Sequence, residues 1–291
     1  FFYWDLTFLL YIGGTFLKQL SSLLKISVSL FLLFLHMTAS GGNRYGIEAG
    51  AGEAGMGYAC VMKEGFWSSF NNQALLAFNS YCEFGINYDN RFGIKELGTR
   101  TAGFLIPAGK ASVGAVYSHF GYTDFKRDVA GLACGLKLSE IIAAGVQIDY
   151  FSERTSGEYN NNQYITFETG LIVSPSDNIK IGLHLFNPVP NSLRKNNHPV
   201  SIRIGAGIDL SKILFAGAEA EMSTGSHLIL RTGFEYKAAK NLCLRAGFST
   251  RNNSFCFGTG YQIGIVKIDL GFATHEMLGV TSSASLIFKI H

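Results

Sequence analysis

The sequence predicts an all-β fold: a transmembrane antiparallel β-barrel of about 14 strands, preceded by a short N-terminal plug segment that contains a helix. Three observations lead to this prediction. Only 15% of the 291 residues are charged, which indicates that much of the surface avoids water. Beyond residue 40, no apolar run reaches the roughly 20 residues that a membrane-spanning helix needs. From residue 80 onward, polar and apolar residues instead alternate with a period of two, in segments bounded by turn residues.

Residues 1–40 are expected to be a leader. Lys18 and Lys25 precede an apolar run over 26–35, and small residues follow at 38–40, which is the layout of a secretory signal peptide cleaved near residue 40. The residues before Lys18 are interpreted as an upstream extension of the reading frame. A transmembrane anchor is the alternative interpretation, but the two lysines interrupt the apolar stretch.

Residues 41–79 do not follow the strand pattern and are expected to plug or brace the barrel that follows at 80–291. The run over 50–57 (GAGEAGMG) is flexible and packs closely, and 66–78 (FWSSFNNQALLAF) has the apolar spacing of a short helix. A phosphate-binding loop is excluded because no apolar strand precedes these glycines and no Lys-Ser/Thr follows them. The residues singled out in this plug segment are Gly52, Gly55, Met56, Gly57, Trp67, Phe70, Asn71, Asn72 and Gln73.

Fourteen alternating segments follow the plug, an even number, as bacterial outer-membrane barrels require. They are expected at 82–90, 98–107, 111–121, 127–138, 141–152, 163–174, 178–187, 200–209, 213–222, 227–237, 241–249, 254–262, 265–274 and 280–290. Every second connection is tight, which is typical of periplasmic turns. The connections on the other rim include the long polar stretches at 153–162 and 188–199.

The two faces of each segment differ in composition. Ile268 and Leu270, for example, alternate with Lys267, Asp269 and Gly271. Glycine recurs on the polar face, where it weakens an exposed strand but suits a crowded, curved barrel interior. A secreted soluble β-sandwich that binds a ligand is the alternative fold, because it would alternate as well, but its polar face would be solvated.

The ionisable residues of the polar face are the candidates for lining a lumen or a ligand path. They are Glu83, Asp149, Glu168, His184, Arg203, Glu219, Arg231, Glu235, Arg245 and Asp269. Because acids and bases on this face are nearly equal in number, they are expected to form paired networks and not a one-signed ion filter.

No catalytic, metal or cofactor site is indicated, so the chain is not expected to be an enzyme. His184 is the one mature histidine that faces inward in mid-strand, and no G-x-S-x-G motif accompanies it. The five cysteines lack C-x-x-C spacing, which argues against a zinc site. A formal net charge of +3 indicates no nucleic-acid partner.

A family resemblance appears in the plug. Residues 49–59 (AGAGEAGMGYA) and 65–77 (GFWSSFNNQALLA) resemble the start of Bacteroidetes outer-membrane proteins of the PorV/PorQ type, which are similar in fold to FadL-type hydrophobic-compound transporters. In that family, small residues ending in G-M-G are followed by an N-P-A-G-L-A or N-Q-A-G-L-A element and then by a barrel of about fourteen strands. Leu75 stands where the family usually has glycine.

The resemblance implies a location in the outer membrane of a Gram-negative, Bacteroidetes-like bacterium, with the lipid bilayer as a partner. It also implies one of two non-enzymatic functions. The first is passage or binding of a small hydrophobic compound. The second is a structural or shuttle role in type IX-like protein secretion and surface attachment, with secretion-system proteins as partners. Passage predicts an apolar pocket beneath the long loops and a gap in the wall or plug. A partner role predicts exposed apolar loops and no continuous internal path.

Overall fold

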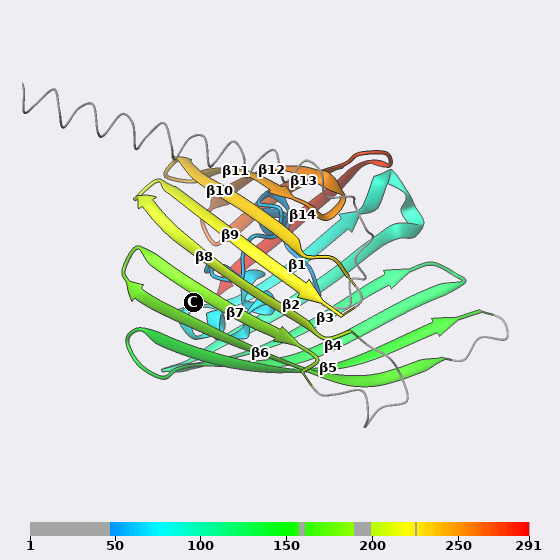
Figure 1. Cartoon of the computed structure of the whole chain (residues 1–291), viewed down its shortest axis with the longest axis horizontal. Coiled ribbons are helices and arrows are strands. Elements are labelled where there is room, and N and C mark those ends of the chain that lie inside the picture. Colours follow the sequence, from blue (N-terminus) through cyan, green and yellow to red (C-terminus); the bar gives the residue numbers. More distant parts are fainter. Residues whose placement is uncertain (1–46, 157–160, 189–198, 225, 291) are drawn as a thin grey trace, which may run out of the picture. The chain divides into compact units, whose positions relative to one another are not determined.

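The computed structural model describes residues 47–156, 161–188, 199–224 and 226–290 of the chain. Within these residues, fourteen strands form one closed antiparallel barrel (Figure 1). Each strand pairs with its sequence neighbours, and β1 closes the barrel by pairing with β14. The predicted barrel is confirmed, and a two-sheet soluble sandwich is excluded. The predicted leader at 1–40 lies outside the described residues.

The strands begin and end close to where the alternation predicts, with bounds that differ by at most three residues. They are β1 (Cys82–Asn90), β2 (Gly98–Ala108), β3 (Ala111–Gly121), β4 (Phe125–Lys137), β5 (Ile142–Thr155), β6 (Asn162–Ser176), β7 (Ile179–Phe186), β8 (Ser201–Ser211), β9 (Leu214–Ser223), β10 (Ile229–Ala239), β11 (Leu242–Ser249), β12 (Ser254–Ile263), β13 (Val266–His275) and β14 (Gly279–Ile290). The short helical turns are α2 (Ala51–Gly55), α3 (Ser68–Asn71), η1 (Gln73–Phe78), η2 (Arg91–Gly93), η3 (Lys95–Leu97) and η5 (Arg251–Asn253). No helix among the described residues is both long and apolar enough to cross a bilayer.

Alternation along each strand separates an apolar outer face from a polar inner face. In β1, Phe84 and Ile86 are exposed on the outside, while Glu83, Asn87 and Asp89 are buried inside. The same division runs around the wall, because successive side chains of a strand point to opposite faces. The exterior therefore presents a belt of apolar side chains to the surroundings, as in barrels that face lipid.

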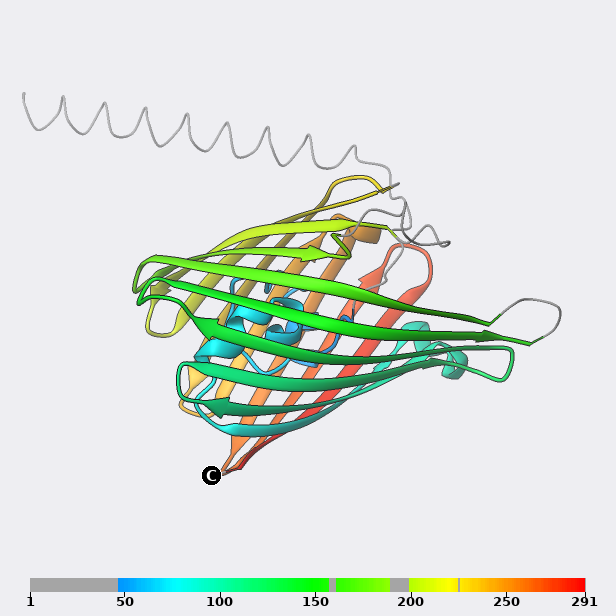
Figure 2. The ribbon, with the colours of Figure 1, turned by 90° about the horizontal axis from the view of Figure 1, so that it is seen from below.

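The two rims of the barrel differ in their connections. At the turn rim, strands are joined by short turns, such as the one between β8 and β9, and the barrel wall both begins at Cys82 and ends at Ile290 there. At the loop rim, strands β3 to β6 extend well beyond the other strands (Figure 2). The register shifts that interrupt the regular pairing, near Lys237, Val173 and Asp209, all lie toward the turn rim.

Candidate functional site

Residues 47–79, called the luminal segment below, pack against the inner face of the wall (Figure 2). Met56, Met62 and Trp67 are buried almost completely. Near the beginning of the segment, the Ala51 amide donates a hydrogen bond to Ser285 Oγ of β14 at 2.7 Å. The segment therefore occupies the interior of the barrel and is tied to its wall.

The helix expected over 66–78 does not form as one piece. Asn72 has an extended backbone (φ −149°, ψ 106°), so the chain makes the short turn α3 before it and the 3-10 turn η1 after it. The Asn72 side chain donates to the carbonyl oxygens of Val61 (2.6 Å) and Leu171 (3.3 Å), and it accepts a bond from the Ala74 amide. These contacts stabilise the interruption, because they replace backbone bonds that a continuous helix would make.

Wall glycines form a belt on which the luminal segment rests. They are cross-strand neighbours in two runs: Gly135, Gly145 and Gly170 on β4 to β6, and Gly207, Gly217, Gly233 and Gly247 on β8 to β11. A Cβ atom at Gly145 would lie 2.3 Å from the Gln73 carbonyl carbon, and one at Gly247 would lie 2.3 Å from that of Met56. Glycine is thus required at Gly145 and Gly247 because backbone approaches backbone there, whereas the side chains of Met62 and Phe215 pack against Gly207 and Gly217.

Glu219 of β9 joins the wall to the luminal segment. Its Oε1 accepts hydrogen bonds from Arg203 Nε (2.7 Å) and Arg231 Nη1 (2.8 Å). Its Oε2 accepts from the backbone amides of Cys60 (3.2 Å) and Val61 (3.0 Å). One buried carboxylate therefore satisfies two guanidinium groups and two segment amides, as a buried charge must to be tolerated.

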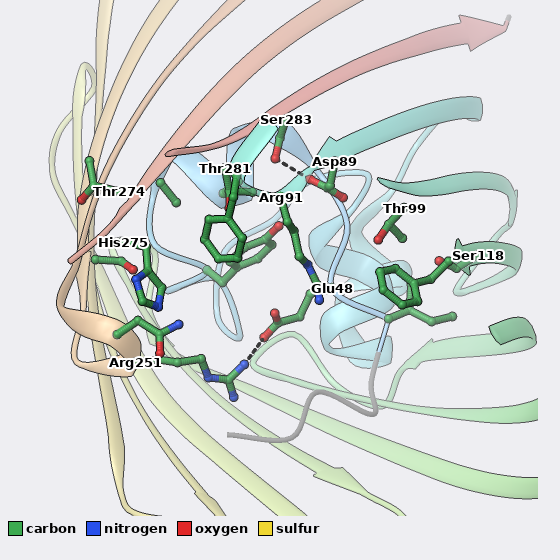
Figure 3. A pocket seen from close by; sticks show the side chains of 18 of the residues that line it. Glu48, Asp89, Arg91, Thr99, Ser118, Arg251, Thr274, His275, Thr281 and Ser283 are labelled. Atoms are coloured by element: carbon green, nitrogen blue, oxygen red, sulfur yellow. Dashed lines mark hydrogen bonds and ion pairs between the residues drawn. The ribbon is translucent and has the colours of Figure 1, made fainter. Parts of the chain in front are cut away.

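The ion-pair network continues from Glu219 toward the loop rim. Arg231 also bonds Glu221, whose other oxygen accepts from Arg251 Nη2 at 2.9 Å. Arg251 in turn lies 3.4 Å from Glu48 Oε1 of the luminal segment (Figure 3). Charges thus alternate in sign along this part of the interior.

A second network surrounds Arg245 of β11. Its guanidinium donates to Glu235 Oε2 and to Asp269 Oδ1, both at 2.7 Å. Lys63 of the luminal segment reaches Glu235 at 2.9 Å, and Lys267 reaches Asp269 at 3.1 Å. This network is closer to the turn rim, and in it the luminal segment supplies a cation to a wall carboxylate, whereas in the first network it supplies backbone amides and the Glu48 carboxylate.

His184 belongs to a third polar cluster, on β5 to β7. Its Nε2 lies 3.0 Å from Glu168 Oε2, which also accepts a hydrogen bond from Gln73 Nε2 at 2.7 Å. Beside them, Gln147 Nε2 donates to Asp149 Oδ1 at 2.7 Å. Within the described ranges, no group of three His, Cys, Asp or Glu side chains is placed to hold a metal ion.

Two groups of the luminal segment have shifted pKa values. Burial raises the pKa of the Cys60 thiol to about 12. Burial also raises the pKa of the Glu53 carboxyl, although Lys267 and Arg245 oppose this rise. The interior therefore disfavours added negative charge at both positions.

A cavity of about 380 Å³ lies between the luminal segment and the loop rim (Figure 3). Ile47, Ala54 and Tyr58 of the luminal segment border it on one side. The other lining residues come from strand ends and loops: Asp89, Arg91, Phe92, Thr99, Ser118, Phe120, Arg127, Val129, Arg251, Asn252, Ser254, Ala273, Thr274, His275, Thr281 and Ser283, with Glu48 between. An apolar pocket is expected beneath the loops. The cavity found there differs, because hydroxyl, charged and aromatic groups line it together.

The ten predicted lumen residues all lie on the inner face, but none of them lines this cavity. Most bond one another or the luminal segment, and Glu83 lies 3.7 Å from Lys289 near the turn rim. A smaller cavity of about 50 Å³ includes Glu168, His184 and Arg203, together with Phe70 and Asn71 of the luminal segment.

The cavity-lining charges were missed because they lie at or beyond strand ends. Asp89 is next to last in β1, Arg91 and Arg251 begin the short turns η2 and η5, and His275 ends β13. The predicted strand bounds and strand order already place all four residues at the same rim, and this shared position could have identified them as a group.

Comparisons with solved structures identify the fold. The barrel is similar to a Pseudomonas aeruginosa FadL homologue (TM-score 0.63, 13% identity, 86% of this chain and 100% of the other) and to the CymD monoaromatic hydrocarbon channel (TM-score 0.64, 12% identity, 86% and 99%). It is also similar to the Pseudomonas putida toluene transporter TodX (TM-score 0.62, 11% identity, 86% and 98%). No protein-family model and no curated protein sequence matches the chain. At these identities, the likeness shows a FadL-like barrel fold.

Proposed function

We propose that this chain is an integral outer-membrane protein that admits a small, largely hydrophobic compound through the loop-rim cavity, with the luminal segment as the plug of the lumen. The cavity between the loops and the luminal segment is the observation that carries this proposal. Its volume of about 380 Å³ falls in the range of small-molecule sites, roughly 300–1,000 Å³. The apolar exterior belt supports insertion in a bilayer.

The lining of the cavity suits a compound with one polar end. Phe92, Phe120 and Val129 offer apolar contact, while Thr99 and Ser118 offer hydroxyl groups. Among the described residues, the buried Thr99 Oγ1 has no hydrogen-bond partner, so it is available to a ligand. An aromatic or aliphatic body with a hydrogen-bonding group fits this lining better than a plain hydrocarbon does.

Passage beyond the cavity requires the luminal segment to shift. The backbone of the segment packs directly on wall glycines such as Gly145 and Gly247. The segment is also held by Glu219 on the wall and, through Lys63, by Glu235. We infer that the compound reaches the turn rim only when part of this seal opens. FadL-like neighbours described as a toluene transporter and a hydrocarbon channel support the class of cargo.

The test is uptake into proteoliposomes that contain the full chain. Radiolabelled toluene, benzyl alcohol and decanoate are offered to wild type and to Thr99→Trp, which fills the cavity without removing a hydrogen bond. We expect at least tenfold slower uptake of the accepted compound by Thr99→Trp. Equal uptake by both proteins, or uptake no faster than through protein-free liposomes, would count against passage.

A disulfide tests the plug. Ala51→Cys/Ser285→Cys joins the luminal segment to β14 where the native hydrogen bond already brings the two residues together. Uptake is expected to fall on oxidation and to recover on reduction of the same sample, with Ser285→Cys alone as the control. Uptake that is indifferent to oxidation would exclude movement of this end of the segment.

The PorV/PorQ resemblance, with its Bacteroidetes origin, rests on the motif of residues 49–77 alone, and so does the alternative role in type IX-like secretion. That role predicts stable capture of secretion-system proteins by the tagged chain in detergent extracts. Capture without any uptake in liposomes would favour this role over passage.

A further inference from the structure

Ionisable side chains interrupt the apolar exterior at one place near the loop rim. Arg100, His119 and Asp128 are successive cross-strand neighbours on β2, β3 and β4. Lys126 and Arg154 form the next outward cross-strand pair, on β4 and β5. These five residues, called the basic patch below, share the outer face of the neighbouring strands β2 to β5.

The basic patch has an excess of positive charge. Asp128 is its single carboxylate, and it accepts hydrogen bonds from Tyr117 Oη (2.6 Å) and Arg154 Nη2 (3.3 Å), with His119 Nδ1 at 2.8 Å. Within the described part of the chain, Arg100 and Lys126 form no ion pair, and the Arg154 side chain is 61% exposed. Three permanent cations therefore face one anion, which leaves the patch with two uncompensated positive charges.

The patch adjoins the apolar belt. Tyr88 is the cross-strand neighbour of Arg100, and the Arg100 guanidinium lies 5.9 Å from the centre of its ring. Tyr117 and Tyr150 are exposed one row closer to the middle of the barrel. Tyrosine at the edge of an apolar belt is typical of the level of lipid head groups. The basic patch thus lies where a bilayer changes from hydrocarbon to head group.

Among the residues that the structure describes, β8 to β12 carry no charged side chain on the outer face near the same rim. There, the outward residues near the strand ends are apolar, as with Ile202 of β8, Met222 of β9 and Phe255 of β12. Exposure to water alone does not favour clustering of cations on one group of strands. The asymmetry instead favours a specific anionic partner at β2 to β5.

We propose that the basic patch binds the phosphate groups of a phosphorylated lipid in the outer leaflet of the membrane. Guanidinium groups bind phosphate oxygens through paired N–H donors, and Lys126 adds a point charge. Tyr88 and Tyr117 would contact the acyl-chain end of the same lipid. This inference rests on the proposed membrane location but not on passage of a compound.

The test measures lipid binding to the full chain in a neutral detergent by native mass spectrometry. Diphosphorylated lipid A is compared with the same lipid after removal of both phosphates. Arg100→Ala/Lys126→Ala/Arg154→Ala is compared with wild type and with Lys110→Ala/Lys212→Ala/Lys240→Ala, which removes the same charge from exposed positions at the turn rim. Heat modifiability on gels establishes that each variant is folded.

We expect wild type to prefer the phosphorylated lipid and the patch variant to bind it about a hundredfold more weakly, at roughly fivefold for each cation removed. The turn-rim variant should bind like wild type. Equal weakening in both variants, or equal binding of the two lipids, would overturn the proposal. Because no transport is measured, failure of uptake in liposomes leaves this result unaffected, and failure here leaves the uptake result unaffected.

Discussion

Gly145 of β5 lies against the backbone of Gln73 so closely that a Cβ atom at position 145 would stand 2.4 Å from the Gln73 carbonyl oxygen. A Cβ at Gly135, its cross-strand neighbour, would stand 2.5 Å from the same oxygen. Wall and luminal segment therefore meet without any side chain between them. Such contact makes the packing sensitive to one methyl group.

Gly145→Ala is expected to destabilise the protein by about 1–3 kcal/mol, because overpacking forces the luminal segment off the wall. Urea unfolding in micelles measures the change. Ala130→Val, which adds volume on the outer face of β4, is the control and should have little effect. A Gly145→Ala protein as stable as wild type would mean that the segment is not held against the belt.

Glu219→Gln should loosen the luminal segment around Cys60 and Val61. The substitution leaves two buried guanidinium groups short of one negative charge, and breaking buried pairs typically costs about 3–5 kcal/mol. Hydrogen exchange of the 60 and 61 amides is expected to accelerate while the strand amides stay protected. Glu64→Gln, which removes a more exposed partner of Lys180, should cost under about 1 kcal/mol. Uniform acceleration throughout the barrel would contradict a local role for Glu219.

Stability at alkaline pH should depend on Cys60. Its pKa is raised by burial to about 12 from an ordinary value of 9.0, so the folded protein holds this proton more tightly than the unfolded chain does. The resulting stabilisation is complete below about pH 9 and is lost as pH rises toward about 12. The unfolding free energy of wild type should thus fall further over this window than that of Cys60→Ser. Parallel curves for the two proteins would show that the thiol does not ionise on unfolding.

Trp67 should report on the luminal segment. It is fully buried and packs edge-on against Phe66, with ring centres 4.7 Å apart. With Trp4→Phe removing the other tryptophan of the chain, emission is expected to be blue-shifted and insensitive to iodide. Quenching should appear in the Glu219→Gln variant before the barrel unfolds. Iodide quenching in the wild type at neutral pH would place Trp67 outside the seal.

Sequence alone predicts the wall well, for a physical reason. Strand alternation has a period of two, so Phe84 and Ile86 against Glu83 and Asn87 already assign inside and outside. Glycine on the inner face likewise indicates close packing before any contact is known. These signals are local, and each strand repeats them.

The interior is harder to predict because its interactions join residues far apart in the chain. Nothing near Glu219 shows that its partners include the amides of Cys60 and Val61. The break at Asn72 depends on the carbonyl of Leu171, a distant residue that the helical spacing within 66–78 cannot reveal. The cavity charges at Asp89, Arg91 and Arg251 come together only when the barrel closes.

The position of the luminal segment also constrains the order of assembly. Residues 47–79 precede every strand in the chain, yet strands from β1 to β14 surround them. The seam that completes the barrel pairs Cys82 with Ile290, so the ends of the wall meet only after the last strand is made. Because loop closure grows costlier with chain length, this seam is expected to form late, around a segment already in place. The luminal segment would then act as a template around which the wall closes.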